Sequence, residues 1–160
     1  MAQDELTAVN GWALYAFDLF HERLEELVAA AEQIENDDPD GFPSHPIVKL
    51  LVCVNKAIRN SVPSDPSHTD FRQGLTLGRG MSHWCRVKRL LPQRYRLFFQ
   101  YRSNAPKIII YAWLNDEATL RKAGAKSDCY AVFRAMVSRG LIPNSFEDLR
   151  KASSSLPSAS

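Results

Sequence analysis

The stretch of residues 84–102, WCRVKRLLPQRYRLFFQYR, carries side chains of two different kinds in alternation. A period of two places successive side chains on opposite faces of a β-strand. In the second half of the stretch, one set is mainly cationic: Arg94, Arg96, Phe98, Gln100 and Arg102. The other set is apolar or aromatic: Tyr95, Leu97, Phe99 and Tyr101. The pattern predicts a strand with one face toward a core and one face crowded with cations.

The first half of the stretch alternates in the same way, with Trp84, Arg86 and Lys88 on one face and Cys85 and Val87 on the other. Residues 90–93, which include Pro92, have the composition of a short connection between two strands. We therefore predict a β-hairpin that carries Arg86, Lys88 and Arg96 on one sheet face. Like charges at such spacing repel unless an anion or an acidic partner binds there, so this face is the first candidate functional surface.

The charge of the whole chain is unevenly distributed, although the formal net charge is only +2. Residues 1–70 hold 13 acidic and 4 basic side chains, whereas residues 71–115 hold 9 basic side chains and no acidic one. A segment of this kind indicates a surface for nucleic acid or phosphate. The alternative is an ordinary solvated basic face, and charge alone does not separate the two.

The length and composition, 160 residues of which 45% are hydrophobic, fit one domain with a real core. We place this domain at residues 1–152 and expect the low-complexity residues 153–160 to be a disordered tail. No apolar run approaches the roughly 20 residues of a membrane span. The acidic start at residues 1–6 does not resemble a signal peptide, so we expect a cytoplasmic protein without a membrane partner.

The three cysteines, Cys53, Cys85 and Cys129, are odd in number and widely spaced. This usage is typical of reduced thiols in a cytosolic protein. No pair of cysteines or histidines has the spacing of metal ligands, so we expect neither a metal nor another cofactor.

The N-terminal half predicts one strand followed by two helices. Residues 10–17 are aromatic-rich and predict the strand. Residues 19–36, with Asp18 as the N-cap, carry an apolar stripe at helical spacing. Pro46 suits the first turn of a second helix, and the two helices are expected to pack on one face of the sheet.

The C-terminal half predicts the rest of the sheet and one more helix. We expect loop at residues 62–70 and an irregular lead-in at 71–80. Residues 107–114 are apolar at both parities, which predicts a central strand covered on both faces. A short helical turn through Lys122 and a last helix from Ser127 or Asp128 to Gly140 follow. The resulting order predicts an α+β fold with an antiparallel sheet, two N-terminal helices and a C-terminal helix.

The chain resembles the YhaV toxin family, within the wider RelE/ParE-like toxins, from about Val9 to Leu149. The resemblance is carried together by VNGWALYA at residues 9–16, WCRVK at 84–88, RYRLFF at 94–99 and WLNDEATLR at 113–121. It implies a RelE-like microbial RNase-type fold and an endoribonuclease that cleaves mRNA, free or on the ribosome, and inhibits translation. It also implies a PrlF-like antitoxin as partner, and binding of operator DNA only as the toxin–antitoxin complex.

The resemblance implies a metal-independent mechanism in which the RNA 2′-hydroxyl attacks the neighbouring phosphodiester. Arg86 and Lys88 match the basic pair that RelE-type toxins carry before the hairpin, and Arg96 matches the arginine that follows a tyrosine on the next strand. Arg96 is expected to stabilise the phosphorane, Arg86 to hold the phosphate, and Lys88 to serve as base or proton relay. Tyr130 matches the family's C-terminal tyrosine and is expected to stack on a base or donate a proton.

The chain departs from that pattern at residues 115–117, Asn-Asp-Glu, where many RelE-like toxins carry a histidine or an arginine. Arg121 or Lys126 is expected to supply the missing cation, and His83 is an alternative proton carrier. Further phosphate contacts are expected from four arginines: Arg72, Arg79, Arg94 and Arg102.

Two other classes of function stay open at this point. Toxins of the ParE type share the implied fold but act by binding a protein, without catalysis. A nucleic-acid-binding module without catalysis would also need a basic face. The basic triad of Arg86, Lys88 and Arg96 favours the enzyme, and the residues alone leave the general base and the general acid unassigned.

Overall fold

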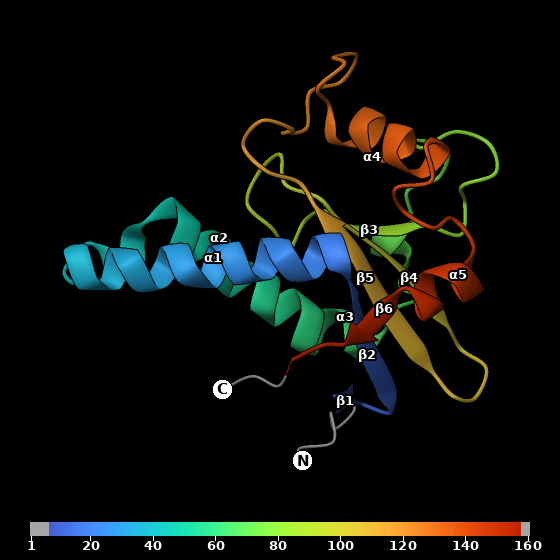
Figure 1. The fold of residues 1–160 in the computed structure, drawn as a ribbon, viewed down its shortest axis with the longest axis horizontal. Helices are drawn as coiled ribbons and strands as arrows, with labels where there is room; N and C mark the ends of the chain where they lie inside the picture. Colours follow the sequence, from blue (N-terminus) through green and yellow to red (C-terminus); the bar gives the residue numbers. More distant parts are fainter. Residues whose placement is uncertain (1–6, 158–160) are drawn as a thin grey trace.

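The computed structural model describes residues 7–157, arranged as a sheet between two groups of helices (Figure 1). The acidic start at residues 1–6 and the last residues of the expected tail, 158–160, lie outside the described residues. Within residues 7–157, none of the helices combines the length and the apolar character that crossing a membrane requires.

The sheet has six strands over the described residues: β1 (Ala8–Val9), β2 (Trp12–Phe17), β3 (Cys85–Val87), β4 (Leu97–Arg102), β5 (Ile108–Leu114) and β6 (Ser153–Ser155). Their order is β1-β2-β5-β4-β3, and β6 pairs with the free part of β2. β5 is central, as predicted, and β3, β4 and β5 are antiparallel neighbours. β2 and β5, however, are parallel, so the prediction of an antiparallel sheet is wrong and the sheet is mixed. Parallel pairing is available to them because a long crossover that includes helices separates them along the chain.

Two helices cover one face of the sheet, as predicted. α1 (Asp18–Asp37) and α2 (Pro46–Lys56) lie side by side in Figure 1, and α1 contacts β5. Phe17 rather than Asp18 is the N-cap, and Asp18 is the first helical residue. α2 continues through a π-helical turn, η2 (Ala57–Ser61), into the short α3 (Val62–Ser64), so the expected loop begins later than predicted. Apolar burial explains the extension, because Val62 is fully buried.

The opposite face is also covered, which corrects the prediction of an open cationic face. α4 (Cys129–Ser138) and α5 (Phe146–Lys151) lie there, with the loop that precedes β3. The Phe98 and Phe133 rings stack with centroids 4.2 Å apart, and Trp84 packs edge-on against Phe133. The alternation itself is confirmed, since Leu97 and Phe99 belong to the core on the α1/α2 side. Aromatic side chains of the predicted cationic face therefore form a second core.

The hairpin between β3 and β4 is confirmed, with Arg86 opposite Phe98. Its connection spans residues 88–96 and is longer than the predicted 90–93. Lys88, Arg94 and Arg96 therefore lie in the connection and not in the strands. Arg94 has a φ of 73°, in the left-handed region that residues other than glycine seldom adopt. This conformation is incompatible with a regular strand.

The C-terminal part differs most from the prediction. Residues 116–122 form turns instead of a helical turn. α4 begins after Asp128 and is followed by Gly140 at a φ of 77°, as predicted. The prediction that residues 153–160 are a disordered tail is wrong for the first of these residues, because Ser153–Ser155 form β6 against β2. The Leu156 N–H then donates to the Leu14 carbonyl at 2.9 Å, and the Leu156 side chain is 1% exposed.

We predict that Leu156→Ala destabilises the protein by about 2–4 kcal/mol, because it leaves a cavity in the core under β2. Ser154→Ala, in the exposed position of β6, is the matched control and should change the free energy of unfolding by less than about 0.5 kcal/mol. Chemical denaturation of both variants measures the difference. Equal stabilities would mean that the C-terminal strand does not contribute to the fold.

Candidate active site

A pocket of about 520 Å³ opens beside the β3–β4 connection and is lined by Lys88, Arg89, Leu91, Gln93, Arg94 and Arg96. Four of these six side chains are cationic and none is acidic. We call this site the cationic pocket. Without a carboxylate among its lining residues, its positive potential is available to an anion such as a phosphate group.

Arg96 is the buried member of the cationic pocket, with 7% of its surface exposed. Its Nη1 donates to the Tyr95 carbonyl at 2.9 Å, whereas its Nε has no partner among the described residues. Arg23 and Arg102 also have an unpaired Nε, but each of them has a carboxylate within 4.0 Å. Arg96 forms no ion pair within residues 7–157. Burying a guanidinium without an ion-pair partner costs free energy. A phosphate bound beside it would compensate its charge.

The backbone on which Arg94 and Arg96 stand is held by Asn115, which directly follows β5 and is fully buried. The Asn115 Oδ1 accepts from the Arg96 N–H at 2.8 Å, and its Nδ2 donates to the carbonyls of Arg94 and Thr119 at 3.0 and 2.9 Å. The sequence analysis noted this residue only as part of the departure from the RelE-like pattern at residues 115–117. The departure from the RelE-like pattern at this position thus has a structural role, since Asn115 fixes the hairpin connection.

Arg86 and Tyr130, two of the predicted catalytic residues, are brought together. The Arg86 Nε donates to the Tyr130 hydroxyl at 3.0 Å, and its Nη1 donates to the Asp70 carbonyl. The Tyr130 ring is buried and meets Phe98 edge-on, with the ring centroids 5.4 Å apart. Because the hydroxyl oxygen accepts from Arg86, its own hydrogen is free to be donated elsewhere.

Arg121 lies over the ring of Tyr130, with its Cζ 4.6 Å from the centroid. Its charge is paired with Asp128, whose Oδ2 is 2.9 Å from the Arg121 Nη1. Asp128 also accepts from the backbone N–H groups of Lys122 and Tyr130 at 2.7 and 3.1 Å. The sequence identified Asp128 only as a candidate start of the helix. In the structure it also positions Tyr130 and compensates the cation beside it.

The other predicted site residues fall into two groups. Lys88 and Arg94 are exposed and line the cationic pocket with Arg96, and the Arg94 Nε donates to the Arg121 carbonyl at 3.0 Å. Arg89, which the sequence analysis did not single out, joins them. Its position within the acid-free segment was the signal that was missed.

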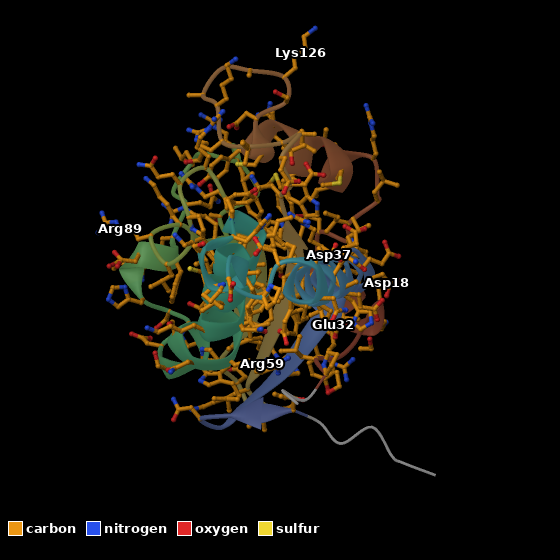
Figure 2. The ribbon with its side chains drawn as sticks, turned by 90° about the vertical axis from the view of Figure 1, so that its left-hand side faces the viewer. Asp18, Glu32, Asp37, Arg59, Arg89 and Lys126 are labelled. Carbon is orange, nitrogen blue, oxygen red and sulfur yellow. The ribbon has the colours of Figure 1, made fainter. Side chains whose placement is uncertain are left out.

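Five predicted residues lie elsewhere. Arg102 is at the other end of β4, roughly 20 Å along the strand, and pairs with Glu147 at 3.0 Å. Arg72 lies beside Cys85, on the strand edge, and Arg79 is exposed in the preceding loop. Lys126 projects outward from its loop in Figure 2. The His83 Nε2 donates to the Asn144 carbonyl at 2.8 Å, so this ring is bound to the loop before α5.

The Cys85 and Cys129 thiols are poorly suited to act as nucleophiles. All three cysteines are free, as expected. Burial raises the pKa of Cys85 to about 11 and that of Cys129 to about 11, against the smaller opposing effect of nearby arginines. Thiolate is therefore scarce at neutral pH. Over residues 7–157, no three His, Cys, Asp or Glu side chains gather closely enough to hold a metal ion.

The charge separation of the sequence is also a separation in space. In Figure 2, Asp18, Glu32 and Asp37 of α1 lie on the opposite side of the view from Arg89. No residue of α1 lines the cationic pocket, so the carboxylates of this helix are not part of the pocket lining.

Comparison with known proteins places the chain in a family. The family described as "Toxin with endonuclease activity, of toxin-antitoxin system" matches residues 14–154. The chain is 44% identical to "Ribonuclease toxin YhaV" of Escherichia coli strain K12 over 144 residues, which cover 89% of this chain and 92% of the relative. It is 45% identical to "Toxin YhaV" of Escherichia coli O6:H1 over 142 residues, which cover 88% and 91% of the two chains. No solved structure gives a significant match. Because these matches span nearly the whole chain, this protein belongs to the YhaV family of toxins with endonuclease activity.

Proposed function

We propose that this toxin is a metal-independent endoribonuclease that cleaves mRNA at the cationic pocket and thereby inhibits translation. The observation that carries the proposal is the buried Arg96, which forms no ion pair within the described residues and lines a pocket with three other cations and no acid. A bound phosphodiester supplies what this group lacks. The relative named a ribonuclease toxin supports RNA as the substrate.

The reaction that we infer is attack of the RNA 2′-hydroxyl on the adjacent phosphorus. The bond from phosphorus to the 5′-oxygen of the next nucleotide breaks, which leaves a 2′,3′-cyclic phosphate and a 5′-hydroxyl. The protein must align the attacking oxygen, remove its proton, stabilise the phosphorane and protonate the leaving oxygen. Arg96 and Arg86 are assigned to the phosphorane, because guanidinium groups match phosphate oxygens in geometry and charge.

Two further groups are assigned to proton transfer. Tyr130 is the proposed acid, since its hydroxyl accepts from Arg86 at 3.0 Å and keeps its own hydrogen available. Lys88, exposed in the cationic pocket, is the proposed base or proton relay. Arg89 and Arg94, also in this pocket, are assigned to the neighbouring phosphates.

We further propose that the domain has the RelE-like fold of microbial RNases, which the antiparallel strands β3, β4 and β5 and the two N-terminal helices support. Membership in a toxin–antitoxin system implies an antitoxin. We propose that this partner is PrlF-like, that the toxin acts in the cytoplasm on mRNA, free or on the ribosome, and that it binds operator DNA only with the antitoxin.

We predict that Arg86→Ala and Arg96→Ala each lower the rate of RNA cleavage by about 10²–10³-fold, because each removes one preorganised donor from the phosphorane. Arg139→Ala, which removes an exposed arginine at the end of α4 distant from Tyr130, is the charge-matched control and should cleave normally. Cleavage of a defined RNA, with thermal melts to verify folding, measures the effect. Arg96→Lys keeps the positive charge but removes the guanidinium group, so its comparison with Arg96→Ala separates the effect of the charge from that of the guanidinium geometry. Normal cleavage by a folded Arg96→Ala variant would exclude the assignment.

We predict that cleavage survives an excess of EDTA and leaves 2′,3′-cyclic or 3′-phosphate ends, because no step of the proposed reaction requires a metal-bound water. End-group analysis by mass spectrometry measures the outcome, first on free RNA and then on translating ribosomes. Products with a 5′-phosphate that disappear with EDTA would refute this mechanism. Tight RNA binding without cleavage in either setting would favour a module that acts by binding alone.

We predict that the antitoxin covers the cationic pocket with an acidic segment, since such a segment competes directly with phosphate. Its association rate should then fall steeply as salt rises. Hydrogen exchange with and without the antitoxin should show protection at residues 88–96 and at the start of α4. Protection confined to α1 and α2 would contradict the expectation and indicate inhibition from a distance.

A further inference from the structure

A second pocket, of about 190 Å³, lies on the other side of Lys88 and Arg89 and plays no part in the chemistry proposed above. It is lined by Ser61, Ser64, Asp65, His68, Asp70, Phe71, Lys88, Arg89 and Leu90. We call it the Asp70 pocket. Its volume is below the roughly 300–1,000 Å³ of sites that hold whole drug-sized ligands, which suits a single small ring system.

The lining of the Asp70 pocket combines an apolar base with polar groups of both signs. Phe71 is buried, and its ring meets that of His68 edge-on, with the ring centroids 6.2 Å apart. Asp65 and Asp70 offer carboxylates, and Lys88 and Arg89 offer cationic donors. A flat ligand with apolar faces and a polar edge that carries both donors and acceptors fits this combination. Nucleobases have these properties, and proteins that recognise single-stranded RNA bind them in this way.

The Asp70 side chain is the polar group of this pocket that is best placed to take a ligand. The Asp70 carboxylate approaches Arg89 at 3.9 Å and the His68 Nδ1 at 3.8 Å, which are both too long for hydrogen bonds. The His68 Nδ1 instead accepts from the Asp70 N–H at 3.0 Å, so the ring orientation is fixed. The lone pairs of the Asp70 carboxylate therefore remain available for hydrogen bonds, beside Arg89, which is ion-paired with Asp70 but not hydrogen-bonded to it.

The Asp70 pocket is also joined to the candidate active site. Lys88 and Arg89 line both pockets, so the two sites share one wall. The Asp70 carbonyl accepts from Arg86, which is assigned to the phosphorane. A phosphate in the cationic pocket and a base in the Asp70 pocket would thus belong to the same short stretch of one RNA strand.

We propose that the Asp70 pocket binds one nucleobase beside the cleaved phosphodiester and prefers guanine there; this rests on the proposed ribonuclease function. Guanine presents two adjacent N–H donors, N1–H and the N2 amino group, to a single carboxylate. Its O6 and N7 accept from arginine or lysine, which is a common specific contact to this base. Uracil flanks its one N–H with carbonyl oxygens, which a carboxylate repels. A carboxylate acceptor at Asp70 beside a cationic donor at Arg89 therefore matches the donors and acceptors of guanine best.

The first test measures binding by calorimetry, with guanosine 3′-monophosphate and uridine 3′-monophosphate as probes. The wild type should bind the guanine nucleotide at least about tenfold more tightly. Asp70→Asn should abolish this preference, while the bond from the Asp70 backbone carbonyl to Arg86 is retained. Glu32→Gln, which removes one negative charge from an exposed position of α1, is the matched control and should keep the preference. Equal affinities of the wild type for the two nucleotides would overturn the proposal.

The second test maps cleavage sites on a long RNA of mixed sequence by sequencing the new 5′ ends. The wild type should cut with guanine enriched at one fixed position beside the broken bond, and Asp70→Asn should cut without that enrichment. Unchanged enrichment in Asp70→Asn would overturn the base pocket and leave the ribonuclease function intact. A wild type that prefers the guanine nucleotide in calorimetry but cuts no RNA would refute the function and not the pocket.

Discussion

The hydrogen bonds of one buried side chain, Asn115, hold the backbone on which the cations of the candidate site depend. They join the end of β5 to the Arg94 carbonyl and the Arg96 N–H, at 3.0 and 2.8 Å. Residues 94–96 need this support for two reasons. Arg94 adopts a left-handed φ, and the segment carries two like charges that repel each other. Each buried backbone group left without a partner would cost about 1–3 kcal/mol, so a smaller side chain at residue 115 could not keep the connection in place.

Arg96 differs from two other arginines of the chain in that it has no acidic partner among the described residues. Arg121 is paired with Asp128 and Arg102 with Glu147, at 2.9 and 3.0 Å, and each also lies over an aromatic ring. These two arginines contribute to packing and position neighbouring segments. Arg96, buried like a structural residue, lacks such a partner among the described residues. The folded protein therefore bears an electrostatic cost that binding of an anion removes, and such a cost is typical of a site kept ready for its ligand.

Much of the fold could be predicted from the sequence because burial imposes simple periods. Apolar residues at both parities identified β5 as central, and the alternation in β4 sorted Leu97 and Phe99 from Phe98 correctly. What failed depended on contacts distant in the chain. The parallel pairing of β2 with β5 leaves no periodic signal in the local sequence. The serines of β6 have the composition of a disordered tail, and they form a strand only because the edge of β2 is available for pairing. At the site, Arg86 and Tyr130 were each identified as candidates, but their contact was not predicted. The roles of Asn115 and Asp128 could not be deduced, because asparagine and aspartate are equally suited to cap a helix.

Arg86 differs from Arg96 in a way that bears on how the site works as a unit. Its guanidinium connects α4, through the Tyr130 hydroxyl, to the segment at Asp70, through the backbone carbonyl. Arg86 therefore contacts both the proposed proton donor and a residue that lines the proposed base pocket. A base seated at Asp70 would steady that carbonyl, and with it the orientation of Arg86 and Tyr130. Base recognition would then raise the rate of the chemical step as well as the affinity, because binding energy would be used to align the groups that act in the transition state.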